Sequence, residues 1–335
     1  MKKKITAAVL ACLLLTGCGM DTMADSLADD IAGQLESLYG QNTTQEWQLE
    51  PETEPMQIQT PEPTKTAENS PIELWDANDL ELLRENPTGN FMLASGIMVN
   101  DNFQSIDNFN GTLDGQGFSI RGIQPQLNGM EANGLFVTLG ENAVVRNLTV
   151  EITAEITAQM REAVYRLYVN GLAEVNFGTI SGCKVYSEIT GAPVYDPIGG
   201  NDGTIENCSV VTRTKDVQTV YGFVGGNNGS LHDCYAELHV ENCSVLTGLT
   251  NRNWTDIANC TITATGKNVS EFYCAATQNY ARISGCTFDV QLTPPAGEEL
   301  SWATSWLSGV EDDFDSSNTV NVREGNESGE KCGKT

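Results

Sequence analysis

The residues of this sequence that are most capable of chemistry are cysteines at a regular spacing. Five of them follow one another at intervals of 25 or 26 residues: Cys183, Cys208, Cys234, Cys260 and Cys286. Thiolates bind zinc and exchange disulfides, so such a series could form a metal or redox site. The chain has only two histidines, His232 and His239, to serve as further ligands or general bases. This scarcity disfavours a zinc site and histidine-based catalysis.

Carboxylates could act on a polysaccharide. Enzymes that cleave glycan chains need clustered carboxylates for calcium binding or acid–base work, and the lyases add an arginine base. The arginines considered, Arg213 and Arg282, have no column of acidic residues beside them in the sequence pattern. The best acidic candidates are Asp101, Asp107 and Asp114. Because Asp114 belongs to a turn pattern and the other two flank an exposed strand, we predict no catalytic set and treat an enzyme as the weaker alternative.

Aromatic side chains could bind a ligand directly. Flat aromatic faces suit sugar rings and the contact sites of proteins alike. The candidates lie in an inserted loop and on later repeats: Tyr165, Tyr168, Trp254, Tyr273 and Tyr280. The alternative is that these rings only cover the edges of the fold.

An internal repeat of about 26 residues positions these side chains. An aliphatic residue stands three positions before each of the five cysteines, and a hydrophobic residue stands two positions after it. A degenerate earlier copy, Gly140 to Val150, has Leu148 in place of cysteine. Seven positions before each cysteine is an asparagine: Asn176, Asn201, Asn227, Asn253 and Asn279. Columns that stay in register over five copies indicate a repeat architecture.

The composition of each repeat predicts its fold. Short runs rich in β-branched residues alternate with Gly, Asn and Asp, and no helical pattern interrupts them. We therefore predict an all-β protein, a right-handed parallel β-helix with about 26 residues per coil. The residue before each cysteine is Gly, Asn or Asp, which tolerate a left-handed backbone, so a corner should fall there. Successive coils should stack about 4.8 Å apart.

Stacking assigns the columns a structural role. Parallel thiols in a straight column cannot converge on a tetrahedral metal, so the five cysteines should fill the core as small apolar side chains. A disulfide between adjacent coils would be close enough but misdirected. The asparagine column should supply hydrogen bonds to the turns. Three more thiols lie off the column: Cys243, Cys274 and Cys332. We expect no metal and no cofactor.

The N-terminus predicts export. Residues 1–17 combine three lysines with a short apolar run, as secretion signals do. The segment Leu15-Thr16-Gly17-Cys18 resembles the lipobox of bacterial lipoproteins. That resemblance implies removal of the signal peptide and acylation of Cys18. The protein would then be held by a lipid bilayer in the bacterial cell envelope, facing outside the cytoplasmic membrane.

The remaining chain divides into three segments. Residues 18–70, rich in Glu, Gln, Thr and Pro, should form a disordered tether. Residues 71–295 should form the β-helix, with Asp76 as the N-cap of a short capping helix and an inserted loop around Met160 to Tyr168. Residues 296–335 should form a C-terminal cap, followed by a disordered acidic tail; two tryptophans support that cap, Trp302 and Trp306.

The formal net charge of −27 restricts the partners. A strongly acidic chain repels polyanions, which argues against nucleic acid, anionic lipid surfaces and polyuronates unless calcium bridges them.

Two segments resemble a known group of β-helices. FNGTLDGQGFSI, Phe109 to Ile120, resembles the opening coil of pectate-lyase-like and GLUG-repeat proteins, whose usual form is F-x-G-T-x-D-G-x-G-x-x-I. GFVGGNNG, Gly222 to Gly229, resembles the repeat that names the GLUG group. The resemblance covers about residues 72–290 and implies a bacterial surface protein or adhesin-like module. The cysteine column and the lack of an attached catalytic domain depart from the group.

The resulting hypothesis is a cell-surface lipoprotein that presents its β-helix as an adhesin-like or ligand-binding module, with a glycan or a surface protein as the expected ligand. Two alternatives stay open. One is a polysaccharide lyase or glycoside hydrolase of the pectate-lyase-like fold, and the other is a non-catalytic spacer of the envelope.

Overall fold

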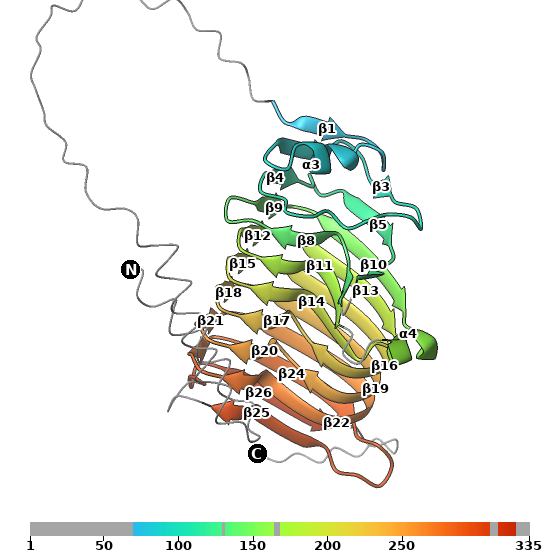
Figure 1. The fold of residues 1–335 in the computed structure, drawn as a ribbon. Coiled ribbons are helices and arrows are strands. Elements are labelled where there is room, and N and C mark those ends of the chain that lie inside the picture. Colours follow the sequence, from blue (N-terminus) through green and yellow to red (C-terminus); the bar gives the residue numbers. More distant parts are fainter. Residues whose placement is uncertain (1–69, 129–130, 164–167, 309–313, 326–335) are drawn as a thin grey trace, which may run out of the picture. The chain divides into compact units, whose positions relative to one another are not determined.

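The computed structural model describes residues 70–128, 131–163, 168–308 and 314–325 (Figure 1). The predicted signal peptide and nearly all of the predicted tether, Cys18 included, lie outside these ranges, as do Tyr165 and Cys332. Within them, no helix is both long enough and apolar enough to cross a membrane.

The first side of each coil is a sheet of nine short parallel strands, which we call face A. Each coil contributes one strand to face A, and that strand pairs with the strands of the neighbouring coils. Its strands in order are β1 (Ile72–Leu74), β2 (Asn90–Leu93), β4 (Thr112–Asp114), β9 (Val144–Arg146), β12 (Thr179–Ser181), β15 (Thr204–Glu206), β18 (Ser230–His232), β21 (Ile257–Ala258) and β23 (Ile283–Ser284).

A second sheet of seventeen strands bends round the other two sides of the coil (Figure 1). The side that follows face A, face B, carries β3 (Ile97–Met98), β5 (Ser119–Ile123), β10 (Thr149–Glu155), β13 (Lys184–Thr190), β24 (Thr287–Thr293) and β26 (Thr319–Glu324). The third side, face C, carries β8 (Phe136–Leu139), β11 (Tyr168–Asn176), β14 (Val194–Asn201), β17 (Val224–Asn227), β20 (Thr250–Asn253) and β25 (Ser301–Ser308). Three long strands run from face B into face C: β16 (Ser209–Tyr221), β19 (Tyr235–Thr247) and β22 (Thr261–Asn279). The short strands β6 (Gln126–Asn128) and β7 (Glu131–Asn133) form an antiparallel pair beside them.

The strand register confirms the predicted parallel β-helix. On face A, the aliphatic residues that precede the cysteines pair with one another from coil to coil. Ile180 is the register partner of Ile205, and Leu231 is that of Ile257. On face B, the column after the cysteines is also in register: Val185, Val210, Ala236, Ile262 and Phe288. Side chains alternate between the two surfaces of a strand, so each register column is either wholly inside or wholly outside the coil.

The corner predicted just before each cysteine is present. The backbone there is left-handed, with positive φ at Asn147, Gly182, Asn207, Asp233, Asn259 and Gly285. A second left-handed corner separates face B from face C, and it carries Gly191, Asp216, Asn242 and Asn268. Both corners use the residue types that reach this conformation at low cost.

The interior of the coil is one continuous hydrophobic column. Its first coils stack phenylalanines, with ring centroids 6.2 Å apart for Phe91 and Phe109 and 5.4 Å apart for Phe109 and Phe136. Later coils contain Val, Ile, Leu and Cys side chains with little or no exposure. Because each inward column continues through the coils, the coils bury one another's apolar faces.

The capping helix begins later than predicted. Helix α3 spans Glu81–Glu85 and follows Leu80, with no side-chain cap bond. The carboxylate of Asp76 instead accepts a hydrogen bond from the Asn78 amide at 2.8 Å, which forms a turn before the helix. The helix ends at Glu85, with Asn86 as its C-cap. In the inserted region, helix α4 spans Ala158–Ala163.

The solenoid also continues past residue 295, where the prediction ended it. Strand β25 pairs with β22, Phe314 bridges to Ile283, and β26 pairs with β24 in parallel register. These segments complete a further coil instead of a separate cap. Part of the predicted acidic tail is therefore a strand. The cysteine and asparagine columns stop before this coil, so they gave no sign of it.

Candidate functional site

The five cysteines of the column lie inside the coil and are free thiols. Their sulfurs lie near main-chain carbonyl oxygens. For example, Cys208 Sγ is 3.2 Å from Glu206 O. Burial raises the pKa of the off-column thiols Cys243 and Cys274 to about 12. No group of three or more His, Cys, Asp or Glu side chains in the described ranges could hold a metal ion.

The asparagine column is a continuous hydrogen-bonded ladder inside the turn between faces C and A. Asn176 Nδ2 donates to Asn201 Oδ1 at 2.8 Å, and Asn201 Nδ2 donates to Asn227 Oδ1 at 2.9 Å. The series continues from Asn227 to Asn253 at 3.0 Å and from Asn253 to Asn279 at 2.8 Å. These asparagines are at least 99% buried, so no ligand can reach their amides.

The three carboxylates considered for catalysis do not form a site. Asp101 and Asp107 are exposed. Asp114 is 8% exposed and accepts hydrogen bonds from Arg146 Nε at 2.8 Å and from the Gln116 amide at 2.9 Å. Burial raises the pKa of Asp114, but these bonds and that from Asn147 outweigh it and hold the pKa below 3.8. Asp114 therefore fixes a turn between two coils.

Each of the two arginines has an acidic residue on an adjacent coil, which the sequence pattern did not show. Arg282 Nε donates to Asp315 at 3.0 Å, and Asp315 lies in the last coil, which was not predicted. Arg213 is the register partner of Glu188 on one side and of His239 on the other. Strand pairing between repeats, which the sequence does not display directly, creates both neighbourhoods.

Three of the five predicted aromatic candidates meet at a groove on face C, which we call the aromatic groove. Its volume is about 330 Å³, and its lining includes Tyr168, Asp196, Tyr221, Arg252 and Trp254. Tyr280 adjoins it through its stack with Trp254. Tyr273 lies on the same face, where its hydroxyl donates to Glu271 at 2.9 Å. Tyr165 lies outside the described residues.

The floor of the aromatic groove is bare backbone. It contains Gly199 on one coil and Gly225 and Gly226 on the next. A Cβ atom at Gly225 would lie 2.5 Å from Gly199 O and 2.6 Å from Asp196 Oδ2, so no side chain fits there. At Gly226 the nearest atom would be Trp254 Cζ3 at 3.6 Å, so the indole lies over this glycine.

The aromatic wall is a stacked pair of rings, one of which is half-exposed. Trp254 is 44% exposed. Its ring stacks with that of Tyr280 on the next coil, with centroids 6.2 Å apart and an interplanar angle of 18°. The exposed indole is therefore supported from behind, and its remaining surface is available for a flat ligand.

The polar wall contains a buried acid. The Asp196 side chain is 2% exposed, and Asn170, its register partner, is 1% exposed. Burial, followed by the negative charge of Asp196, raises the pKa of Tyr221 well above its ordinary value, while the Arg252 charge opposes this. Tyr221 is therefore a hydrogen-bond donor at neutral pH and is unsuited to act as a base.

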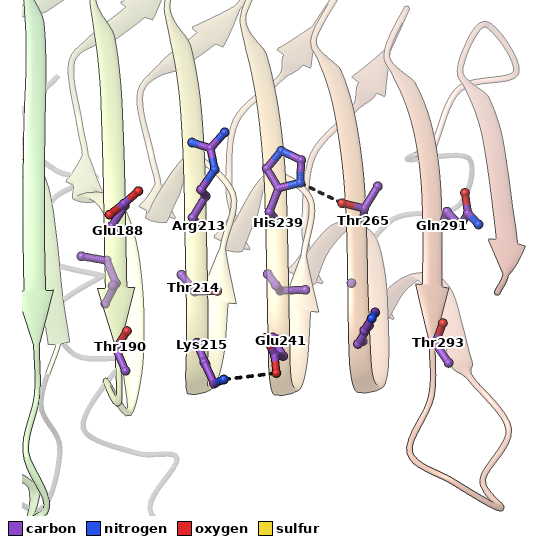
Figure 2. Close-up of a pocket in the computed structure, with 14 residues that line it drawn as sticks. Glu188, Thr190, Arg213, Thr214, Lys215, His239, Glu241, Thr265, Gln291 and Thr293 are labelled. Atoms are coloured by element: carbon purple, nitrogen blue, oxygen red, sulfur yellow. Dashed lines mark hydrogen bonds and ion pairs between the residues drawn. The ribbon is translucent and has the colours of Figure 1, made fainter. Parts of the chain in front are cut away.

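A second groove, which the sequence did not indicate, runs across the strands of face B; we call it the polar groove (Figure 2). Its volume is about 730 Å³. Two rows of outward side chains cross the strands β13, β16, β19, β22 and β24. The first row is Glu188, Arg213, His239, Thr265 and Gln291, and the second is Thr190, Lys215, Glu241, Lys267 and Thr293.

Comparison with known proteins identifies no family. No protein-family model matches the sequence, and no curated protein matches it. One solved structure, from Bacteroides ovatus, is provisionally named an immunoglobulin A1 protease. It is 13% identical, with a TM-score of 0.37, over 76% of this chain and 84% of that chain. At this level the similarity carries no information on ligand or activity.

Proposed function

We propose that this protein is a lipid-anchored bacterial surface protein whose β-helix binds carbohydrate in the aromatic groove. One observation carries the proposal: a half-exposed tryptophan, braced by a stacked tyrosine, stands over a floor of bare glycines. Sugar rings present flat C–H faces, which pack against an indole, and a floor without side chains lets a ring approach the backbone.

The polar residues of the aromatic groove suit the rest of a sugar. Tyr221 and Arg252 offer hydrogen-bond donors to the hydroxyl groups of a sugar. A small number of polar groups beside an apolar wall is the usual composition of a small-molecule site. The volume of about 330 Å³ suits a short segment of a glycan chain.

The anchor part of the proposal depends on the sequence around Cys18. Acylation there would join the domain to a bilayer through a tether of roughly 50 residues with the composition of a flexible coil. Expression in a bacterium with a radiolabelled fatty acid tests it. The wild-type chain should be labelled and found in the membrane fraction, whereas C18S should remain unlabelled.

Binding is tested with the full chain on an array of plant, host and bacterial glycans, followed by calorimetry on any hit. W254A should weaken binding at least tenfold, because it removes the stacking surface. W75A is the matched control, since Trp75 is a 59% exposed tryptophan of the first coil, outside the groove. Equal affinities for the two variants would refute the aromatic groove as the binding site, and no binding to any glycan would leave the envelope spacer as the better hypothesis.

One observation favours a catalytic alternative in the same groove. The buried carboxyl of Asp196 and the carboxyl-bearing Glu174 both line it, and glycoside hydrolysis uses a pair of carboxyl groups. Incubation with polysaccharides, with and without calcium, and assay of new reducing ends and unsaturated sugars tests this hypothesis. Product release that D196N abolishes would establish a hydrolase or lyase, and binding without release would exclude it.

A further inference from the structure

The polar groove gathers positive charge in a strongly acidic protein. The formal net charge of the chain is −27. Yet three basic side chains, Arg213, Lys215 and Lys267, line this groove against two acidic ones, Glu188 and Glu241. In Figure 2, Arg213 and Lys215 stand between Glu188 and Glu241 of the neighbouring strands, and Lys267 follows Glu241 in the strand register.

Two of these cations are unengaged. Lys215 Nζ lies 3.3 Å from Glu241 Oε1 in an exposed ion pair. Arg213 and Lys267 make no ion pair or hydrogen bond within the described ranges. Four other arginines do form ion pairs on this molecule: Arg84, Arg146, Arg282 and Arg323. An exposed guanidinium with five free donors is the group best suited to a carboxylate, which it binds through two parallel hydrogen bonds.

The other side chains of the polar groove are neutral and rich in hydroxyl groups. Thr190, Thr265 and Thr293 contribute hydroxyls, and Gln291 contributes an amide. His239 is held by Thr265 Oγ1 at 2.8 Å and by Glu237 Oε1 at 2.7 Å, so its ring is fixed in place. No aromatic carbocycle lines the groove. Such a surface exchanges hydrogen bonds with a polyol and offers no apolar pocket.

We propose that the polar groove is a second carbohydrate site, selective for a glycan that carries an isolated carboxylated sugar, with the carboxylate on Arg213 beside the neighbouring hydroxyls and with Lys267 as a further cation two strands away. This site is independent of the aromatic groove and of its proposed ligand. The groove crosses strands about 4.8 Å apart, so an extended chain lying along it would meet an equivalent row position at each step.

An isolated charge fits better than a polyanion. The acidic protein repels a polyanion as a whole, whereas charges beyond about 8 Å are screened at physiological ionic strength. One carboxylate in a mainly neutral chain therefore feels the local cations with little of the general repulsion.

A glycan also fits better than an acidic peptide. The strands that the polar groove crosses are paired on both edges, so they offer no free edge for an added peptide strand. Protein partners also need apolar or aromatic anchors at the centre of an interface, and the polar groove has none.

The test uses the full chain and pairs of oligosaccharides that differ by a carboxylated sugar. The probes are sialyllactose against lactose, and glucuronoxylotriose against xylotetraose, with a glutamate hexapeptide and heparin as comparisons. Calorimetry should show at least one acidic sugar bound tenfold or more tightly than its neutral partner. R213Q/K267Q should remove that preference, and the matched double variant R121Q/K184Q should keep it, because it loses the same charge from an exposed arginine and a partly buried lysine of face B outside the groove.

The outcomes separate the two sites. W254A should leave the preference for the acidic sugar unchanged, so failure of the aromatic groove does not decide this proposal. Equal loss in both double variants would show a general charge effect and overturn it. Tighter binding of the glutamate peptide or of heparin than of either acidic sugar would overturn it as well, as would absence of any acidic-sugar preference.

Discussion

The rings of Trp254 and Tyr280 lie face to face, 6.2 Å apart between centroids, although the two residues are separated by one full repeat of the sequence. The parallel register that pairs Asn253 with Asn279 brings them together, because each ring follows its own asparagine by one residue. The hydrogen-bonded ladder inside the turn thus determines the position of the aromatic wall outside it.

Replacement of Tyr280 should therefore act on ligand binding through Trp254. We expect Y280A to weaken glycan binding about three- to tenfold, since a ring pair contributes ~0.5–1.5 kcal/mol that would no longer hold the indole in place. Y280F should bind as the wild type does, because the ring makes the stack. Calorimetric titration distinguishes them, and equal losses in Y280A and Y280F would instead indicate that the hydroxyl contacts the sugar.

The glycine floor gives a second prediction, on two adjacent residues. A Cβ atom at Gly225 would lie 2.5 Å from a main-chain oxygen that cannot move aside, whereas one at Gly226 would lie 3.6 Å from the indole. G225A should destabilise the protein by about 1–3 kcal/mol, as overpacking does, and G226A should leave stability unchanged. Urea unfolding followed by circular dichroism measures both.

The same pair has a functional consequence. G226L should fold but fill the groove under Trp254, so it should lose glycan binding without loss of stability. A G226L variant that binds normally would show that the ligand does not use the floor.

The sequence was sufficient for the coil because each coil repeats one set of constraints. A left-handed corner needs Gly, Asn or Asp, and the inward positions need apolar residues, so a column visible in five repeats defines the register. The second corner obeys the same rule, and Asp216, Asn242 and Asn268 recur every 26 residues, so it was open to discovery by the same argument.

The grooves could not be predicted in this way. Their walls combine residues from different columns whose contact depends on the orientation of side chains across the sheet. Gly225 and Gly226 look like turn residues in the sequence, while in the structure they lie in strand β17 and leave the floor open. The last coil was missed because its inward residues, Val320 and Val322, carry neither the cysteine nor the asparagine signature.

The asparagine ladder gives a third prediction. The Asn227 side chain is fully buried and accepts a hydrogen bond from Asn201 at 2.9 Å while donating to Asn253 and Thr255 at 3.0 Å each. N227A leaves buried polar groups without partners, which should cost about 2–4 kcal/mol of unfolding free energy.

A matched control lies on the outer corner. Asn242 makes comparable bonds to Asp216 at 2.6 Å and from Asn268 at 2.7 Å, but in solvent. N242G keeps the left-handed backbone accessible and should cost less than about 1 kcal/mol. Chemical unfolding of both variants provides the comparison, and similar costs would show that burial of the ladder does not matter.

The buried thiols predict a loss of stability in alkali. Burial raises the pKa of Cys243 and Cys274 from the ordinary 9.0 to about 12. Between these values the unfolded chain releases two protons that the folded chain retains, so stability is complete below pH 9 and falls as the pH rises toward 12. Each thiol should contribute a loss of ~1.4 kcal/mol per pH unit in this window.

Urea unfolding at pH 8.5, 9.5 and 10.5 measures how steeply the free energy of unfolding falls with pH. C243A/C274A should reduce this slope by about twice the contribution of one thiol. V269A is the control, because Val269 is the register partner of Cys243 and its truncation also leaves a cavity but removes no thiol. It should lower stability equally at every pH, and a wild-type slope in the double cysteine variant would show that these thiols ionise normally in the folded protein.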